Sequence, residues 1–361
     1  MNKFTKLIAL LCIATAFTAC KKDSDPIVEI PASDGSTLTL NGLIGTEAGS
    51  SAGNSVFVDF SVDKQTAVAR GSWDLGFYGG ADWRVILNHS MGATAIVLNK
   101  TDLTTVTAAD TTSLISPLLL GQGQGTMTSV DAVDGSLSTY LGGTVIAPIS
   151  ATEADNKVYI VNRGTAGLAA GENRGWQKIR VLRSANGNGY TLQYAKINET
   201  TFKTLSIAKD ANYNFKYASF VTGALNVEPV KAEWDIVWGM STYKANATTP
   251  YPYADLVLIN FAGGVSAAEV LVASGTTYAD FKEANLTGLT FLNTREAIGS
   301  KWRVTGGAPP STTVGGVLSD RFYVIKDGSG NIYKLKFVSY TSTDGGVRGK
   351  PVIEYKLVKK A

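Results

Sequence analysis

Side chains that could carry out catalysis or hold a metal are few in this sequence. It contains one histidine, His89, and two cysteines, Cys12 and Cys20, in 361 residues. A Ser-His-Asp site would have to use His89, and no Gly-x-Ser-x-Gly turn supports one. A zinc site needs several His or Cys ligands, which one histidine and no usable cysteine do not supply. Nucleophilic hydrolase and zinc chemistries are therefore disfavoured.

Acidic residues offer two further possibilities. Asp74 and Asp235 each follow a tryptophan, and two carboxylates brought together in space could hydrolyse a glycosidic bond. Because both occupy the same place in similar segments, a paired structural role, such as accepting backbone N–H bonds at a turn, explains them more simply. The segment 327–331 could bind calcium but lacks the bidentate Glu of a helical calcium loop, so a hairpin turn is the simpler interpretation. We expect no enzyme activity.

The amino-terminal segment has the pattern of an export signal. Two lysines precede an apolar run at 7–19, which is too short to span a bilayer. A Phe-Thr-Ala-Cys sequence at 17–20 resembles a bacterial lipobox, with Phe in place of the usual aliphatic residue. We predict a signal peptide at 1–19 and a lipidated Cys20 that opens a flexible tether at 20–37. Such a protein is expected to be lipid-anchored at the outer membrane or cell surface of a Gram-negative bacterium.

Composition indicates a folded, β-rich protein. Apolar residues make up 44% and charged residues 17% of the chain, which allows a sizeable core and argues against wholesale disorder. The 38 glycines, with abundant Thr, Val and Tyr, favour short strands joined by turns. A net charge of +3 without a dense Lys/Arg stripe gives no sign of nucleic-acid binding. We predict an all-β fold with a minor helical part.

Two Trp-Asp strands organise the chain. The segments 72–77 and 233–238 each contain Trp-Asp, and each is followed by an apolar run that ends in Asn, at 85–88 and 257–260. An Asn-Gly turn within 184–189 predicts a hairpin. The recurring order indicates two diverged copies of one β-rich unit.

The spacing within the two copies sets the expected domains. The tyrosine of a later buried strand lies 86 residues after Trp73 in the first copy and 89 residues after Trp234 in the second. We therefore predict two tandem antiparallel β domains, at 38–200 and 201–361.

With these segments assembled, the chain resembles the HmuY-like lipoproteins, β-rich surface proteins of Gram-negative bacteria. The resemblance is strongest in the second half and rests on segments 217–220, 234–237, 259–265, 323–326, 334–340 and 344–355. Family members with an assigned role are haemophores, which capture haem for a partner outer-membrane transporter. The resemblance implies ligand capture rather than turnover, with haem as the ligand.

Haem iron takes axial donors such as His, Met, Tyr or a Cys thiolate. Family haem binders use paired His or paired Met, and one of these positions falls on Met240. His89 and Met91 lie two residues apart and would point to the same side of a strand. The candidate ligand residues are Met240, Tyr251, Tyr253, His89 and Met91, and each could instead be a packing residue.

Haem binding remains possible through a single donor or through a pair formed across the two domains. Beyond Met240 the chain has neither His nor Met, so the second domain alone cannot supply a His/Met pair. The alternative is a non-enzymatic lipoprotein that binds glycans or a host protein. Exposed aromatic side chains such as Trp83, Tyr251 and Tyr253 would favour that alternative.

Overall fold

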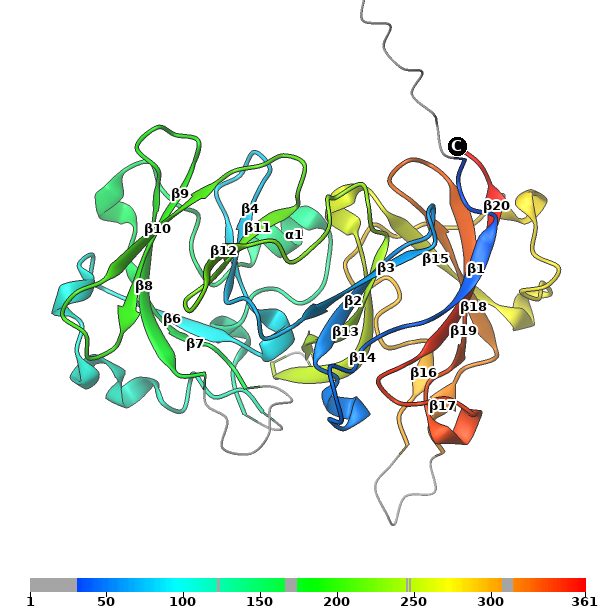
Figure 1. Cartoon of the computed structure of the whole chain (residues 1–361), viewed down its shortest axis with the longest axis horizontal. Coiled ribbons are helices and arrows are strands. Elements are labelled where there is room, and N and C mark those ends of the chain that lie inside the picture. The colour runs from blue at the N-terminus through cyan, green and yellow to red at the C-terminus, as the bar shows by residue number, and fades with distance from the viewer. Residues whose placement is uncertain (1–30, 122–123, 166–173, 245, 247, 307–313) are drawn as a thin grey trace, which may run out of the picture. The chain divides into compact units, whose positions relative to one another are not determined.

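Antiparallel strands are the main regular elements of the described chain (Figure 1). The computed structural model describes residues 31–121, 124–165, 174–244, 246, 248–306 and 314–361. The predicted signal peptide, Cys20 and the first part of the tether lie outside these residues. The predicted all-β fold with a minor helical part is confirmed.

Four sheets of four or five strands contain most of these strands. Sheet I has the order β10-β9-β8-β7-β6 and consists of β6 (Thr94–Leu98), β7 (Val158–Asn162), β8 (Trp176–Arg183), β9 (Gly189–Lys196) and β10 (Lys203–Ala208). Sheet II has the order β12-β11-β4-β5 and consists of β4 (Leu75–Tyr78), β5 (Val85–Leu87), β11 (Phe215–Ser219) and β12 (Gly223–Leu225).

The other two large sheets are built in the same way. Sheet III has the order β14-β13-β2-β3 and consists of β2 (Asn54–Asp59), β3 (Lys64–Ala69), β13 (Ile236–Lys244) and β14 (Pro250–Ile259). Sheet IV has the order β1-β20-β19-β18-β15 and consists of β1 (Gly35–Thr39), β15 (Ser266–Leu271), β18 (Arg321–Lys326), β19 (Ile332–Ser339) and β20 (Val352–Lys359). A small ribbon pairs β16 (Arg303–Val304) with β17 (Gly316–Val317).

Helical structure is limited to short segments. The described residues contain one α-helix, α1 (Leu137–Gly142), which Ser136 caps by accepting a hydrogen bond from the backbone of Thr139. The 3₁₀ turns are η1 (Gly49–Ser51), η2 (His89–Met91), η3 (Leu103–Thr105), η4 (Ala108–Leu114), η5 (Met127–Ser129), η6 (Glu153–Asp155), η7 (Phe261–Gly263), η8 (Val272–Ser274), η9 (Glu283–Leu286) and η10 (Ser342–Asp344).

Local sequence explains the hairpins. The Asn-Gly turn predicted within 184–189 joins β8 to β9, with Gly187 at a φ of 70°, a value that glycine adopts without steric cost. The segment 327–331 joins β18 to β19, and the Asp327 carboxylate accepts hydrogen bonds from the backbone of Ser329 and Asn331. Both hairpin predictions are confirmed.

Pairing between strands far apart in sequence completes every large sheet. In sheet III, β2 pairs with β13, and in sheet II, β11 pairs with β4. In sheet IV, β1 lies beside β20, seen as the blue and red strands in Figure 1. Sheets I and II therefore come from one continuous stretch, 75–225, whereas sheets III and IV combine 35–69 with 236–359.

The described chain from Ala32 to Ala361 forms one compact unit. The expected division into domains at 38–200 and 201–361 stays a prediction, and the strand pairs β2–β13 and β4–β11 cross that division.

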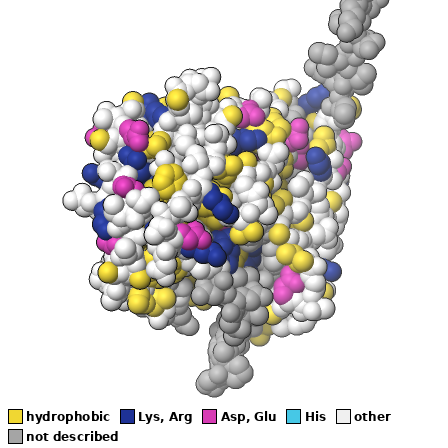
Figure 2. Space-filling model, turned by 60° about the vertical axis from the view of Figure 1, so that its left-hand side comes forward, with side chains coloured by type: hydrophobic (Ala, Val, Ile, Leu, Met, Phe, Trp, Pro, Cys, Tyr) yellow, Lys and Arg dark blue, Asp and Glu magenta, His cyan; other side chains and the backbone are white. Residues whose placement is uncertain are grey.

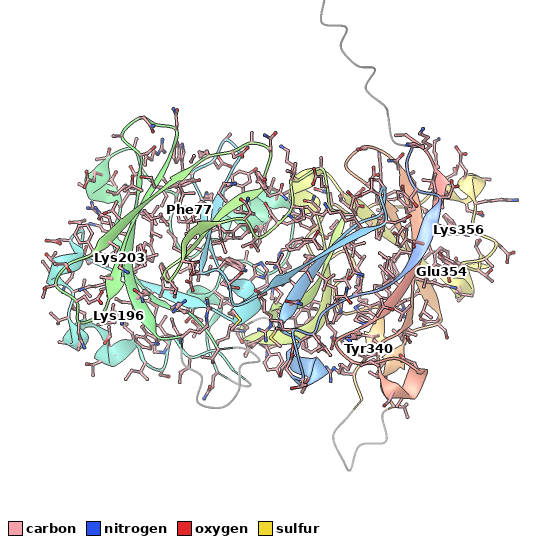
Figure 3. All side chains as sticks on the ribbon, viewed as in Figure 1. Phe77, Lys196, Lys203, Tyr340, Glu354 and Lys356 are labelled. Carbon is pink, nitrogen blue, oxygen red and sulfur yellow. The ribbon has the colours of Figure 1, made fainter. Side chains whose placement is uncertain are left out.

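Two large apolar clusters form the core. One lies mainly among sheets II to IV and includes Tyr340, which packs edge-on against Trp302. The other lies mainly between sheets I and II and includes Phe77, whose ring packs against Tyr190. Figure 3 labels Phe77, which lies on β4, and Tyr340, which directly follows β19. Since the chain has no disulfide among its described residues, this apolar burial is the main source of its stability.

Candidate functional site

A cavity lies between sheets II and III, where the two Trp-Asp strands begin. Its walls carry aromatic rings from both sheets and from the segments that join them: Phe57, Trp73, Tyr140, Tyr217, Trp234 and Phe261. We call this the central cavity. It holds about 640 Å³ of atom-free space that includes open solvent, of which about 70 Å³ is open to the centres of water molecules. The central cavity is thus narrow and mostly apolar.

Matching hydrogen bonds hold the two tryptophans at the cavity. Asn88 and Asn260 each cap a 3₁₀ turn, and each side-chain N–H₂ donates to the carbonyl of the nearby tryptophan, Trp73 at 2.7 Å and Trp234 at 2.8 Å. Each turn ends in a glycine with positive φ, a conformation that disfavours other residues. These paired caps fix the segments that carry the rings.

The carboxylates of the two Trp-Asp motifs accept hydrogen bonds from the backbone. Asp74 accepts a hydrogen bond from the backbone N–H of Phe220 at 2.8 Å, and Asp235 accepts one from that of Phe60 at 2.8 Å. Neither carboxylate lines the central cavity. The predicted structural role of both residues is therefore confirmed.

Polar residues also border the cavity. They are His89, Asn214, Glu228 and Arg295, beside the smaller or capping residues Ser55, Ser90 and Asn260. The amide of Asn214 donates to Asn260 at 2.8 Å. An apolar pocket with a few convergent polar groups is the usual form of a site for a small ligand.

Glu228 lies at the cavity as a buried acid. Its carboxyl group accepts from the backbone N–H of Phe215 at 2.6 Å and from the hydroxyl of Tyr217 at 3.3 Å. Burial raises the pKa of Glu228 to about 8, against the lowering effect of these hydrogen bonds. Glu228 is therefore mainly neutral at pH 7.

His89 is held in its neutral form. Burial, and then the charge of Arg295, lower the pKa of His89 well below its ordinary value. Ser241 Oγ lies 2.9 Å from His89 Nδ1 and accepts a hydrogen bond from Arg295 Nη2 at 2.9 Å. Ser241 therefore links the imidazole of His89 to the guanidinium of Arg295.

The structure separates the other predicted ligand residues from the central cavity. Met91 is 1% exposed, and its sulfur accepts a hydrogen bond from Arg70 Nη1 at 3.2 Å. Met240 lies at an irregularity of β13 and borders a different, small hollow beside Trp238. Of the predicted ligand residues, His89 alone borders the central cavity.

Tyr251 and Tyr253 lie together on β14, away from the central cavity. Tyr253 stacks on Tyr243 of β13 with ring centroids 5.1 Å apart, and Tyr251 lies 6.1 Å from Tyr253. The Arg303 guanidinium lies 5.0 Å from the Tyr253 ring centroid. Burial would raise the pKa of Tyr253, but hydrogen bonding to Arg303 and the charge of Arg303 together lower it. We call Tyr243, Tyr251 and Tyr253 the tyrosine cluster.

Sequence reasoning missed Glu228 and Arg295. Neither stands in a motif, and each is a single charged residue in a segment without clear periodicity. The one available signal was the proximity of Glu228 to the second Trp-Asp strand, which it precedes by a few residues.

Charge and metal ligands do not mark a second site. On the face shown in Figure 2, basic and acidic side chains are interspersed. Among the described residues, no group of three or more His, Cys, Asp or Glu side chains could hold a metal ion. The helices within those residues are too short or too polar to cross a membrane.

The chain thus combines an all-β architecture with an aromatic cavity between two of its sheets. The model of the HmuY protein family matches residues 51–355, so the chain belongs to the HmuY protein family. This is a family of haem-binding surface proteins and not an enzyme family. No curated protein and no solved structure matches the chain significantly.

Proposed function

We propose that this protein is a surface-tethered lipoprotein that captures haem in the central cavity and passes it to an outer-membrane transporter. Membership of the HmuY family supports the class of ligand. The observation that carries the proposal is the ring of aromatic side chains around the central cavity, because such rings stack on flat apolar molecules. Lipidation of Cys20 would supply the tether, as the sequence predicts.

The predicted iron donors among the described residues do not form an axial pair at the cavity. His89 is the one predicted donor there, and its Nδ1 is taken up by Ser241. The sulfur of Met91 accepts a hydrogen bond from Arg70. The macrocycle would therefore be held chiefly by packing against Trp73, Trp234 and their neighbours rather than by two protein ligands on iron.

The narrow shape of the central cavity sets a condition on binding. Ligand pockets span about 300–1,000 Å³, and the space of about 70 Å³ that the central cavity leaves open is far smaller. Entry of a macrocycle therefore requires the lining side chains to move apart. Trp73 and Trp234 line the cavity, so their fluorescence would report the event.

A visible-light titration with haem tests the proposal. The soluble protein from residue 32 onward should shift the Soret band and quench its tryptophan fluorescence at micromolar haem. Val237→Trp fills the cavity from β13 and should abolish both signals. Val62→Trp is the matched control, because Val62 is 48% exposed at the surface. Absence of a Soret shift with the unaltered protein, or equal effects of the two variants, would reject haem capture in this cavity.

The predicted tether has a separate test. Cells that express the full chain should incorporate a palmitate analogue into it, and Cys20→Ser should remove the label and release the protein from the membrane fraction. Labelling that persists in Cys20→Ser would argue against the predicted anchor.

The tyrosine cluster favours a second function, the binding of glycans or a host protein. Its three rings are partly exposed on the β13–β14 hairpin, and flat aromatic surfaces stack on sugar rings. A glycan array probed with the protein and with a Tyr251→Ala/Tyr253→Ala variant tests this function. Hits that vanish in the variant would support it, and an array without hits would count against it.

A further inference from the structure

Arg295 is a buried cation at the wall of the central cavity. Its side chain is 4% exposed. Nη1 donates to the carbonyl of Val133 and Nη2 donates to Ser241 Oγ, each at 2.9 Å. The guanidinium also lies 5.3 Å from the ring centroid of Tyr140. Each of these partners is uncharged, so none of them forms an ion pair with Arg295.

No carboxylate oxygen of the described residues lies within 4.0 Å of the guanidinium. Asp131 borders a small hollow with Arg295, and its two oxygens accept from the backbone of Leu87 and Val145. The charge of Asp131 therefore acts on Arg295 only at longer range, without a hydrogen bond between the two side chains. Burying a charge without an ion pair is costly. Proteins keep such a charge where it has a use.

The acid on the central cavity does not offset this charge. Glu228 directs its two oxygens to Phe215 and Tyr217, and its burial among these rings favours the neutral form. The cavity therefore presents one positive charge to whatever enters it.

We propose that Arg295 receives a carboxylate of the ligand, so that the central cavity selects flat aromatic molecules that carry a carboxylate. This inference rests on the proposed capture function and names the group by which the ligand is oriented. A guanidinium binds a carboxylate through a fork of N–H donors. Two of the five N–H groups of Arg295 are used within the protein, and the others are left for the ligand.

Carboxylate recognition also explains how a ligand could be held without paired iron donors. Haem and the iron-free protoporphyrin IX carry the same carboxylates, and the inference predicts that the site binds both. A charge-assisted bond to a buried group contributes about 1.5–3 kcal/mol, which corresponds to an affinity ratio of about 10 to 100 between an acid and its ester.

The test compares protoporphyrin IX with its dimethyl ester, delivered in the same dilute detergent and followed by quenching of tryptophan fluorescence. The unaltered protein should bind the acid about 10- to 100-fold more tightly than the ester. Arg295→Gln should remove that preference by weakening the acid alone. Arg295→Lys, which keeps the charge but loses the fork, should retain part of it.

Arg180→Gln is the matched control. Arg180 is also a buried arginine, at 8% exposure, and it bonds to Asn156 and Glu153 away from the central cavity. It should keep the full preference for the acid. If Arg295→Gln does not fold, the role of Arg295 can still be tested by comparing the acid with the ester on the unaltered protein and on Arg295→Lys.

The outcomes separate the two proposals. Equal affinity of the unaltered protein for acid and ester would overturn the role of Arg295 and leave capture in the cavity standing. A preference for the acid that survives in both Arg295 variants would also overturn it. Failure of both porphyrins to bind would reject the capture function itself, and the role of Arg295 with it.

Discussion

The two Trp-Asp strands share a hydrogen-bonding frame and differ in charge. Asp74 and Asp235 accept equivalent backbone hydrogen bonds. Asp74 is also paired with Arg163 and Arg174, both at 2.8 Å. Asp235 has no cation partner among the described residues and lies near two further acids. The backbone role of the motif therefore does not depend on the charge of its aspartate.

The environment of Asp235 favours its neutral form. Burial raises the pKa of Asp235 well above its ordinary value, the hydrogen bond from Phe60 lowers it, and the charges of Asp59 and Asp327 raise it further. One copy thus holds an ion-paired carboxylate, and the other holds a carboxyl group that resists ionisation. Substitutions that remove charge but keep shape can test this contrast.

Asp74→Asn should have the largest effect. The amide oxygen can still accept from Phe220, but two largely buried arginines lose their counter-ion. Breaking a buried pair in this way costs about 3–5 kcal/mol of the free energy of unfolding. Urea denaturation followed by tryptophan fluorescence at pH 7 measures the loss. A loss below about 1 kcal/mol would mean that the pairs with Arg163 and Arg174 contribute little.

Asp235→Asn should act in the opposite direction. The folded state keeps the Asp235 proton at pH values where the unfolded chain has lost it, so stability falls as pH rises through the folded pKa. The amide cannot ionise and can still accept from Phe60. The variant should match the unaltered protein near pH 4 and unfold at higher urea concentration near pH 8. Destabilisation equal to that of Asp74→Asn would contradict the difference in charge that we infer between Asp74 and Asp235.

Glu228→Gln should remove a second source of the loss of folding stability with rising pH. The pKa of Glu228 is raised from 4.5 to about 8, so the folded state binds the extra proton across that window and stability falls with pH. The slope contributed by one group is at most about 1.4 kcal/mol per pH unit. Urea midpoints at pH 5, 6, 7 and 8 should fall less steeply in the variant. Parallel profiles for the two proteins would contradict the raised pKa.

His89→Phe should have the smallest effect. Phe261 occupies the matching place in the second copy, at the start of the equivalent 3₁₀ turn. The variant loses the bond to Ser241 and gains apolar surface, so the free energy of unfolding should change by less than about 1 kcal/mol. The reverse change, Phe261→His, should cost about 1–3 kcal/mol, because it places a polar ring against Tyr140. Thermal unfolding of both variants measures the difference.

Much of this structure was predictable from local sequence. The all-β class, the hairpins at 184–189 and 327–331 and the backbone role of Asp74 and Asp235 follow from turn residues and recurring motifs. The HmuY family was predicted from the second half and is confirmed by the family match over 51–355. Each of these features depends on residues that are close in the chain or repeated along it.

The strand partners were not predictable, for a physical reason. Both copies contain a hairpin followed by a Trp-Asp strand. Because the two hairpins are similar, either Trp-Asp strand could pair with the hairpin of its own copy or with that of the other copy. The sequence alone cannot show that β4 pairs with β11 and that β13 pairs with β2. The central cavity depends on those partners, so Glu228 and Arg295 could not be assigned to it in advance. Met240 was placed by family pattern alone and borders another hollow.

The pairing of β1 with β20 has a consequence for the order in which the chain acquires structure. Sheets I and II come from 75–225 and can close while the remainder is still being synthesised. Strands β1 to β3 emerge first. The β2–β3 hairpin can form at once, but β1 and the other edge of β2 find their partners only after β20 and β13 have been made. Such distant partners slow folding, and the open edges of these strands invite pairing with other chains in the meantime. Strands β1 and β2, although they are made early, are therefore among the last to gain all of their partners.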